Sequence, residues 1–95
     1  RIAQLLAWNP ARRHGLTSKG DIAVGYDADI ALVDTTRRVV IRPQDSESTQ
    51  EYTPFDGFTL DAQVTDTFVR GHQVLADAAI VGEPIGRFVA RGPRA

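Results

Sequence analysis

The chain has no cysteine and no methionine among its 95 residues. Without cysteine it has no disulfides, no thiolate zinc sites and no cysteine nucleophiles, which favours a cytoplasmic protein. No apolar run approaches the roughly 18 residues of a membrane span, and no basic segment followed by an apolar core predicts a signal peptide. The net charge is −1, so we expect neither a nucleic acid nor a membrane as partner.

What is present indicates a small globular domain. Hydrophobic residues make up 42% and charged residues 24% of the chain, as in soluble globular proteins. A compact chain of this length buries roughly 60 to 65% of the surface of its unfolded form, so we expect one small core. Because the chain begins at Arg1 and its first apolar residues have no helix cap before them, we also expect a processed, truncated or engineered fragment.

Two short helical segments are predicted at the start of the chain. Ile2, Leu5 and Leu6 recur at helical spacing. Asn9 is then predicted to cap a second helix, with Pro10 at its first position, where the missing N–H costs nothing.

The predicted end of this helix has a basic last turn followed by glycine. Arg12, Arg13 and His14 suit the negative end of the helix dipole. Gly15 is predicted to adopt the left-handed conformation that ends the helix, with Leu16 as its hydrophobic contact.

After the helix the pattern indicates strands. Runs of β-branched and aliphatic residues, bounded by Gly, Pro and Asp turns, predict five or six short strands. The predicted strands cover residues 21–24, 28–34, 37–42, 64–70 and 73–77, with one more short strand near the end. Residues 28–34 are apolar on both alternating faces, as in a strand covered on both sides. The predicted fold class is mainly β with an N-terminal helix.

Two turns and a loop are predicted between the later strands. Gly71-His72 separates two strand-like runs, which predicts a hairpin with a type II′ turn. Asp77-Ala78 follows the second run, and because alanine tolerates positive φ poorly, we expect another turn geometry there. Residues 44–51 are polar, acidic and without periodicity, so they are predicted to form a loop.

The candidate metal ligands are Asp27, Asp29, His14 and His72. An Asp-x-Asp pair can meet a cation, but a calcium loop needs further oxygen ligands at positions where this chain has alanine and valine. A zinc site needs three or four ligands, and the two histidines stand apart. We interpret the aspartates as residues of a turn and of a strand start, His14 as a helix-end cation and His72 as an exposed turn residue.

The remaining polar candidates are also interpreted as structural. The hydroxyls of the acidic loop lack the Gly-x-Ser-x-Gly pattern of a nucleophile, the late glycines do not form a phosphate-binding loop, and the basic tail lacks interleaved aromatics. These residues are Ser46, Ser48, Thr49, Gly82, Gly86, Arg87, Arg91 and Arg94. Tyr52, Phe55 and Phe58 either line a binding surface or anchor their loop, and we favour the anchor because a small core needs large buried groups.

Four segments stand in a characteristic order: NPARRHGL (9–16), KGDIAVGYDADIALVD (19–34), YTPFDGF (52–58) and VTDTFVRGHQVLADAAIVGEPIGRFVAR (64–91). In this order and spacing, over nearly the whole chain, they resemble the C-terminal portion of the cyclic amidohydrolases. This group comprises the dihydroorotase, hydantoinase (dihydropyrimidinase) and allantoinase enzymes of the amidohydrolase superfamily.

The resemblance implies a (β/α)8 barrel with a binuclear zinc centre and a small β-sandwich built jointly from both chain ends. Residues 1–16 then correspond to the last helical segment that packs on the barrel. Residues 17–95 correspond to the C-terminal portion of the β-sandwich, with a loop at about 44–63 that crosses back over the barrel.

The family's metal ligands, by the same resemblance, are an H-x-H pair, a carboxylated lysine, two further histidines and an aspartate on barrel strands. None of these motifs is present, and the sole lysine, Lys19, follows the helix in a turn. We therefore assign no catalytic, metal-binding or cofactor-binding residue to this chain. The zinc is expected in the rest of the parent enzyme.

Two functions remain open, and a divergent non-catalytic relative that scaffolds an active partner is a third that the sequence does not separate from the first. The chain is either a structural C-terminal fragment of a zinc-dependent hydrolase of cyclic amides, inactive by itself and partnered by the rest of the barrel, or a self-standing small β domain that acts as a binding or assembly module. In the first case, strand edges and the apolar face of residues 2–6 lack partners, so we expect self-association.

Overall fold

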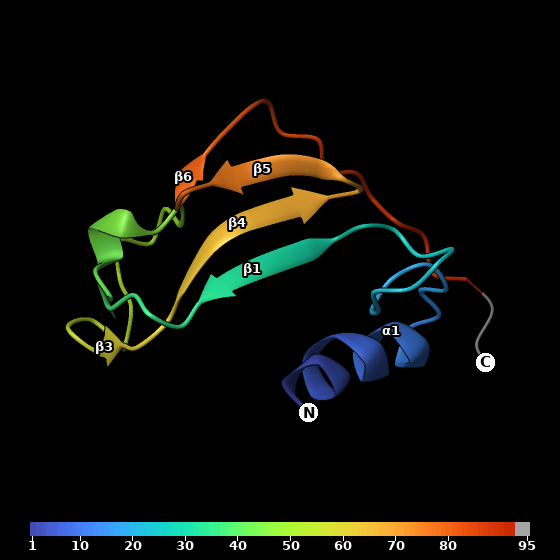
Figure 1. Cartoon of the computed structure of the whole chain (residues 1–95), viewed down its shortest axis with the longest axis horizontal. Helices are drawn as coiled ribbons and strands as arrows, with labels where there is room; N and C mark the ends of the chain where they lie inside the picture. Colours follow the sequence, from blue (N-terminus) through green and yellow to red (C-terminus); the bar gives the residue numbers. More distant parts are fainter. Residues whose placement is uncertain (93–95) are drawn as a thin grey trace.

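The chain folds into a short N-terminal helix followed by a curved antiparallel sheet (Figure 1). The computed structural model describes residues 1–92. The elements are a π-helical segment Gln4–Trp8, α1 Asn9–Arg13, β1 Ile30–Asp34, β2 Val39–Val40, a 3₁₀ turn Pro43–Asp45, β3 Thr59–Leu60, β4 Gln63–Val69, β5 His72–Ala76 and β6 Ala79–Ile80. The predicted class, mainly β with an N-terminal helix, is confirmed.

The helix is continuous across residues 2–13, so the prediction that Asn9 caps a second helix is wrong. Asn9 has helical backbone angles (φ −62°, ψ −47°), and its N–H donates to the carbonyl of Gln4, five residues back. In a regular α-helix the ring of Pro10 would clash with the carbonyl four residues earlier and leave that carbonyl without a donor. The wider π turn accommodates the proline within one helix.

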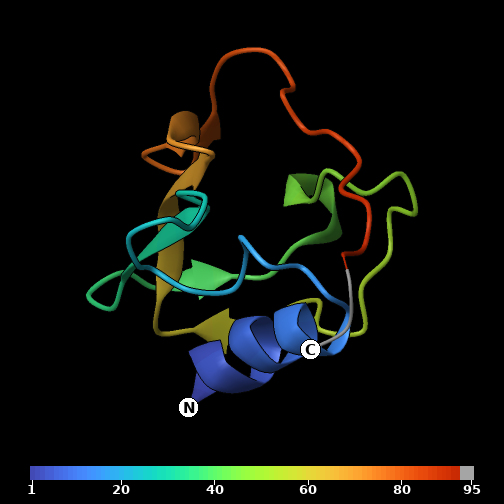
Figure 2. The ribbon, with the colours of Figure 1, turned by 90° about the vertical axis from the view of Figure 1, so that its right-hand side faces the viewer.

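The end of the helix follows the prediction. Gly15 has a φ of +71°, and its N–H donates to the carbonyl of Arg12 at 3.3 Å, while the N–H of Leu16 donates to the carbonyl of Ala11 at 2.8 Å. These two bonds form a Schellman motif. The carbonyl of Gly15 accepts a bond from the N–H of Gly92 at 2.9 Å, so the extended tail that leaves β6 returns to the helix end (Figure 2).

The larger sheet is antiparallel throughout. Its strand order is β1-β4-β5-β6, and β2 pairs with β3 separately. Ile30 lies opposite Phe68 at the start of β1, and the register shifts by a bulge further along the pair. β2 is shorter than the predicted strand at residues 37–42, and β3 lies inside the predicted loop at residues 44–63. Among residues 1–92, β1 pairs with β4 along one edge and with no strand along the other.

The predicted strand at residues 21–24 is wrong. This segment forms a bend and a turn, in which the N–H of Tyr26 donates to the carbonyl of Ala23 at 3.1 Å. Gly20 and Gly25 have φ values of +93° and +92°. These positive values reverse the chain on both sides of the segment, so too few extended residues remain to pair with another strand.

The β4–β5 hairpin turns at Arg70-Gly71, one residue earlier than predicted. Val69 pairs with His72, and Arg70 and Gly71 have φ values of +48° and +81°. A type I′ turn requires positive φ at both central positions, so this is the type I′ geometry and not type II′. The N–H of Arg70 donates to the carboxylate of Asp29 at 2.9 Å, a contact from outside the hairpin that its own sequence does not reveal.

The β5–β6 turn uses Asp77-Ala78 in the geometry that the sequence argued against. Their φ values are +46° and +63°, and Ala76 pairs with Ala79 across the turn. The N–H of Ala78 donates to the carbonyl of Thr65 at 2.8 Å. The short connection between paired strands and this bond impose the left-handed conformation on alanine, at a steric cost of roughly 1–2 kcal/mol.

Replacing Ala78 with glycine is expected to raise the free energy of unfolding by about 1 kcal/mol, because glycine removes the left-handed strain. Part of this gain is cancelled, because glycine loses more conformational entropy on folding than alanine does. Urea unfolding at a fixed protein concentration measures the change. Ala76→Gly, within β5, is the matched control and is expected to lower stability. A destabilising effect of Ala78→Gly would contradict strain at this turn.

The loop between β2 and β3 is held by backbone bonds. The N–H of Ile41 donates to the carbonyl of Phe58, and the N–H of Gly57 donates to the carbonyl of Ile41, both at 2.8 Å. The Phe55 and Phe58 rings meet edge to face with centroids 5.7 Å apart. Tyr52, Phe55 and Phe58 are nevertheless 69%, 54% and 58% exposed, so the expectation that these rings anchor the loop by burial is wrong.

The described chain has little core of its own. Ala11 is the only buried hydrophobic residue among residues 1–92. The accessible surface is 7735 Å², whereas a folded monomer of 10.4 kDa exposes about 5400 Å². The radius of gyration is 15.3 Å, against about 12 Å for a compact chain of this length. The surface exceeds that of a compact domain by about 2300 Å², so the single small core that composition predicts does not form within this chain.

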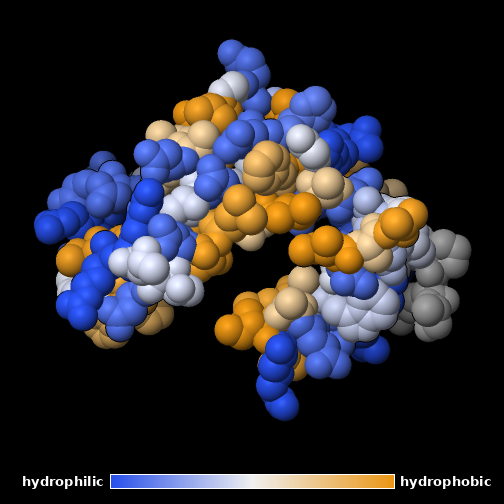
Figure 3. Space-filling model, viewed as in Figure 1, coloured by the Kyte–Doolittle hydropathy of each residue, from blue (hydrophilic) through white to orange (hydrophobic). Residues whose placement is uncertain are grey.

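Some of the exposed apolar side chains line the hollow between the sheet and the helix, and others lie elsewhere on the surface (Figure 3). Leu32 and Val33 of β1 are 48% and 55% exposed, so the prediction that residues 28–34 are covered on both faces is not met by this chain. Within residues 1–92, no helix is long and apolar enough to cross a lipid bilayer.

Candidate functional site

The densest set of polar side-chain contacts lies where the helix end, the loop after it and the β4–β5 turn meet. We call this set the polar junction. Its members are Arg12, Ser18, Lys19, Asp27, Asp29 and Arg70.

Arg12 joins the helix to the loop that follows it. Its guanidinium donates to the carbonyls of Leu16 at 2.7 Å and Lys19 at 2.8 Å, and to the hydroxyl of Tyr26 at 3.1 Å. The guanidinium carbon also lies 4.5 Å from the ring centroid of Trp8 and 5.7 Å from that of Tyr26. Both distances are within the range of a cation–π contact. The planar, multiply donating guanidinium is suited to bonding and stacking at once.

Lys19 occupies the position between the two carboxylates of the Asp-x-Asp pair. Its Nζ lies 2.6 Å from Oδ2 of Asp29 and 3.0 Å from Oδ2 of Asp27. The Ser18 hydroxyl donates to the same oxygen of Asp27 at 3.1 Å. The pair thus binds a lysine ammonium.

The charges of the junction reinforce one another. The hydrogen bond from Lys19 lowers the pKa of Asp27 below the usual carboxyl value, and the nearby charge of Arg87 adds to the effect. Partial burial raises the pKa of Asp29, but the bonds from Lys19 and from the Arg70 backbone outweigh it, so this pKa is also lowered. The hydrogen bond to Asp29 raises the pKa of Lys19. All three groups are therefore ionised at neutral pH.

The junction also ties the sheet to the tail. Beside the bond from the Arg70 N–H to Asp29, the N–H of Gly71 donates to the carbonyl of Ala28 at 2.9 Å. The Arg70 guanidinium donates to the carbonyl of Ile85 in the tail. Three segments that are distant in sequence are thus joined by polar contacts.

The described residues do not fit a metal centre. Among residues 1–92, no three or more His, Cys, Asp or Glu side chains gather into a group that could hold a metal ion. His14 lies at the C-cap of the helix. His72 is the first residue of β5, so its predicted place in the turn is wrong, although its side chain is exposed as expected. The binuclear zinc centre implied by the resemblance finds no ligand set in this part of the chain.

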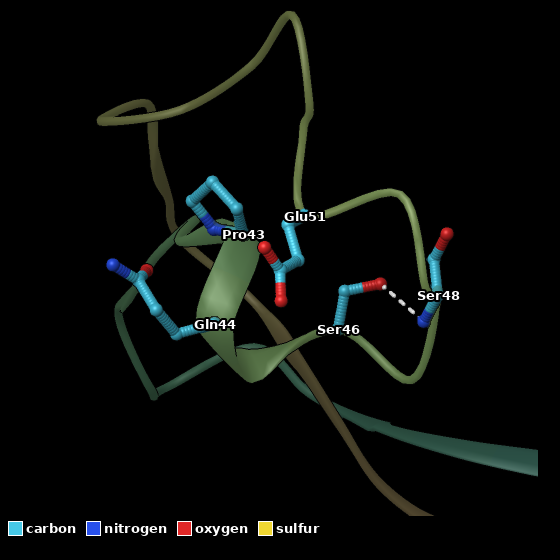
Figure 4. Close-up of a pocket in the computed structure, with 5 residues that line it drawn as sticks. All are labelled: Pro43, Gln44, Ser46, Ser48 and Glu51. Carbon is cyan, nitrogen blue, oxygen red and sulfur yellow. Dashed lines mark hydrogen bonds between the residues drawn. The ribbon is translucent and has the colours of Figure 1, made fainter.

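A polar pocket of about 510 Å³ lies in the loop after β2, lined by Pro43, Gln44, Ser46, Ser48 and Glu51 (Figure 4). The Ser46 hydroxyl accepts a bond from the N–H of Ser48 at 3.1 Å, and the Ser48 hydroxyl accepts one from the N–H of the residue two positions on. Both hydroxyls thus stabilise local turns, which agrees with the loop interpretation. Of the predicted basic tail, Arg94 lies outside the described residues.

The amidohydrolase family matches residues 1–74, more than half of the chain. The chain belongs to the amidohydrolase family. Within this family it is 40% identical over 89 residues to an allantoinase from Rubrobacter xylanophilus, and 41% identical over 88 residues to a dihydroorotase from Methanothermobacter thermautotrophicus. These alignments cover 94% and 93% of this chain and 20% of each relative.

The fold agrees with solved structures of the same family. A D-hydantoinase superposes with a TM-score of 0.81 at 31% identity, over 86% of this chain and 18% of that chain. The resemblance to the allantoinase, dihydroorotase and hydantoinase group is confirmed. The chain spans about a fifth of the length of the curated relatives that it matches.

Sequence reasoning missed the roles of Arg12 and Lys19. It treated Arg12 only as a charge suited to the helix dipole. The spacing of Trp8 and Arg12, four residues apart on one helix, is a local signal that places a cation beside a ring. No comparable signal pairs Lys19 with Asp29, which lies ten residues away across a loop.

Proposed function

We propose that this chain is the C-terminal structural portion of a zinc-dependent hydrolase of cyclic amides, of the dihydroorotase, hydantoinase or allantoinase type. The observation that carries the proposal is the pattern of coverage. Relatives named for each of these activities match 86 to 94% of this chain while it spans only about a fifth of them. The metal ligands and the catalytic groups would then lie in the remaining part of the protein.

The role of this portion is structural. The charged side chains of the polar junction are internally paired, with Lys19 bound by two aspartates, and the described residues offer no metal ligand set. Residues 1–16 would pack on the barrel, and residues 17–95 would supply part of a small β-sandwich, with the loop at about 44–63 crossing over the barrel. The excess surface of about 2300 Å² supports this division, because a compact domain of this mass would hide it.

A segment exchange tests the proposal. We expect that the M. thermautotrophicus dihydroorotase still hydrolyses dihydroorotate when its matching segment is replaced by this chain, because the two segments are 41% identical over 88 residues. The matched control carries the segment of the R. xylanophilus allantoinase at the same boundaries. Deletion of the segment is expected to abolish soluble, active enzyme.

The purified chain alone is the second arm of the test. It is expected to turn over none of dihydroorotate, hydantoin or allantoin, with or without added zinc. Turnover by the chain alone would refute the structural role. An inactive exchange, in a background where the allantoinase segment restores activity, would refute the assignment to this group of hydrolases.

A further inference from the structure

The turn between β4 and β5 opposes the preference of its own residues. Arg70 has a φ of +48°, and a residue with a Cβ adopts positive φ only at a steric cost. The type I′ turn requires this angle at its first central position, where asparagine, aspartate or glycine is preferred. Gly71 and His72 would instead form a type II′ turn, with glycine at the position that requires positive φ. The local sequence therefore favours a turn that the structure does not use.

A bulge accompanies the observed turn. Thr67 of β4 pairs with Leu75 of β5. The next residue of β4, Phe68, pairs with Gln73, so Val74 is the extra residue of a bulge in β5. A turn one residue later would move the extra residue from β5 to β4 and leave the pair of Thr67 and Leu75 unchanged. The hairpin thus has a second register available near its turn, without any change of pairing further along the sheet.

Three hydrogen bonds from outside the hairpin hold the observed turn. The N–H of Arg70 donates to Oδ1 of Asp29 at 2.9 Å. The N–H of Gly71 donates to the carbonyl of Ala28 at 2.9 Å, and the Arg70 guanidinium donates to the carbonyl of Ile85 in the tail. Figure 1 shows the turn beside the loop that leads into β1. A turn one residue later would move all three donors away from these acceptors.

Asp29 is the only charged acceptor of the three, and both of its carboxylate oxygens are engaged. Oδ1 accepts the bond from the hairpin, while Oδ2 lies 2.6 Å from Nζ of Lys19. The cation of the helix-end loop therefore holds the carboxylate at the turn. A hydrogen bond to an ionised acceptor is roughly twice as strong as one between neutral groups, so Asp29 contributes most to the choice of turn.

We propose that Asp29 selects the register of the β4–β5 hairpin. The carboxylate stabilises the turn at Arg70-Gly71, and its loss favours the turn at Gly71-His72. The polar junction and the hairpin then form a two-state element, in which a contact 41 residues away in sequence overrides the local preference. Because the Arg70 guanidinium moves with the turn, its attachment to the tail at Ile85 changes with the register.

Nuclear magnetic resonance of the 95-residue chain tests the proposal. The amide protons of the two residues that flank a two-residue turn lie close together. A contact between those of Val69 and His72 therefore reports the observed register. A contact between those of Arg70 and Gln73 reports the second register, and exchange measurements give its population. Asp29→Ala is expected to shift the ratio of the registers about tenfold toward the second, as for the loss of one bond to a charged group.

Asp27→Ala is the matched control. Asp27 also binds Lys19, but its hydrogen-bond partners among residues 1–92 all lie in the loop before β1 and none in the hairpin. This variant removes a carboxylate of the polar junction and leaves the bond to the turn in place, so the register ratio is expected to stay unchanged. A tenfold shift in Asp27→Ala as well would overturn the proposal.

Two substitutions of Arg70 test the turn without changing Asp29, so they decide the question even if Asp29→Ala does not fold. Both remove the guanidinium, but glycine accepts positive φ, whereas the β-branched valine strongly disfavours it. Arg70→Gly is expected to favour the observed register and Arg70→Val the second. Equal ratios in these two variants, or an unchanged ratio in Asp29→Ala, would overturn the proposal. None of these results depends on whether a longer protein hydrolyses cyclic amides.

Discussion

Replacing Arg12 with alanine is expected to lower the free energy of unfolding by about 3 kcal/mol. The guanidinium donates to two carbonyls of the following loop and to the Tyr26 hydroxyl, and hydrogen bonds that involve a charged group contribute roughly 1.5–3 kcal/mol each when they are partly buried. The substitution also removes the contact with Trp8. Because Trp8 is the only tryptophan, its fluorescence in a urea titration reports the loss directly.

Arg13→Ala is the matched control for this experiment. Arg13 is the next residue of the same helix and carries the same charge, but its side chain is exposed, so its loss is expected to change stability by no more than about 0.5 kcal/mol. Arg12→Lys is expected to lie between the two, since lysine keeps the charge but not the planar fork. Equal effects of Arg12→Ala and Arg13→Ala would mean that the loop does not depend on the guanidinium.

Gly20→Ala is expected to be as costly, about 3 kcal/mol. The φ of +93° strains any residue that has a Cβ. In addition, that Cβ would lie 2.7 Å from Cβ of Ala11 and 2.8 Å from the carbonyl oxygen of Ala7, so the loop would have to move away from the helix. The urea midpoint of unfolding, at a fixed protein concentration, measures the effect.

Gly25→Ala separates the two causes. Gly25 has a nearly identical φ of +92°, but a Cβ at this position would meet no atom within 4 Å. Its substitution therefore includes only the backbone strain, roughly 1–2 kcal/mol. The difference between the two variants measures how closely the loop packs on the helix. If the two variants were equally stable, the close approach at Gly20 would be contradicted.

Features set by neighbours in sequence were predictable. Gly15 and Leu16 end the helix as their types require, because the Schellman bonds form within six residues. The alternation of apolar residues also located β4 and β5 to within one residue. The prediction at Asn9 failed because two local rules competed. Capping favours a new helix there, but the π turn allows the chain to pass Pro10 without ending the first one.

Features set by distant contacts were not predictable. The β4–β5 turn was misplaced by one residue, and its position coincides with the bond that the Arg70 N–H donates to Asp29, 41 residues earlier. The left-handed conformation of Ala78 is imposed by strand pairing, against the preference of the residue itself. The polar junction likewise forms only when the loop after the helix folds back. The residues next to Lys19 in the sequence therefore do not indicate that Asp27 and Asp29 are its partners.

The pairing of Lys19 has a consequence for chemical reactivity. Lys19 is the only lysine of the chain, so its ε-amine is the only side-chain amine that an acylating reagent can modify. The amine is protonated and held by two carboxylates, and a protonated amine has no lone pair with which to attack. Acylation at this one nitrogen is therefore expected to be slower than at a free lysine, because the raised pKa lowers the fraction of neutral amine at a given pH.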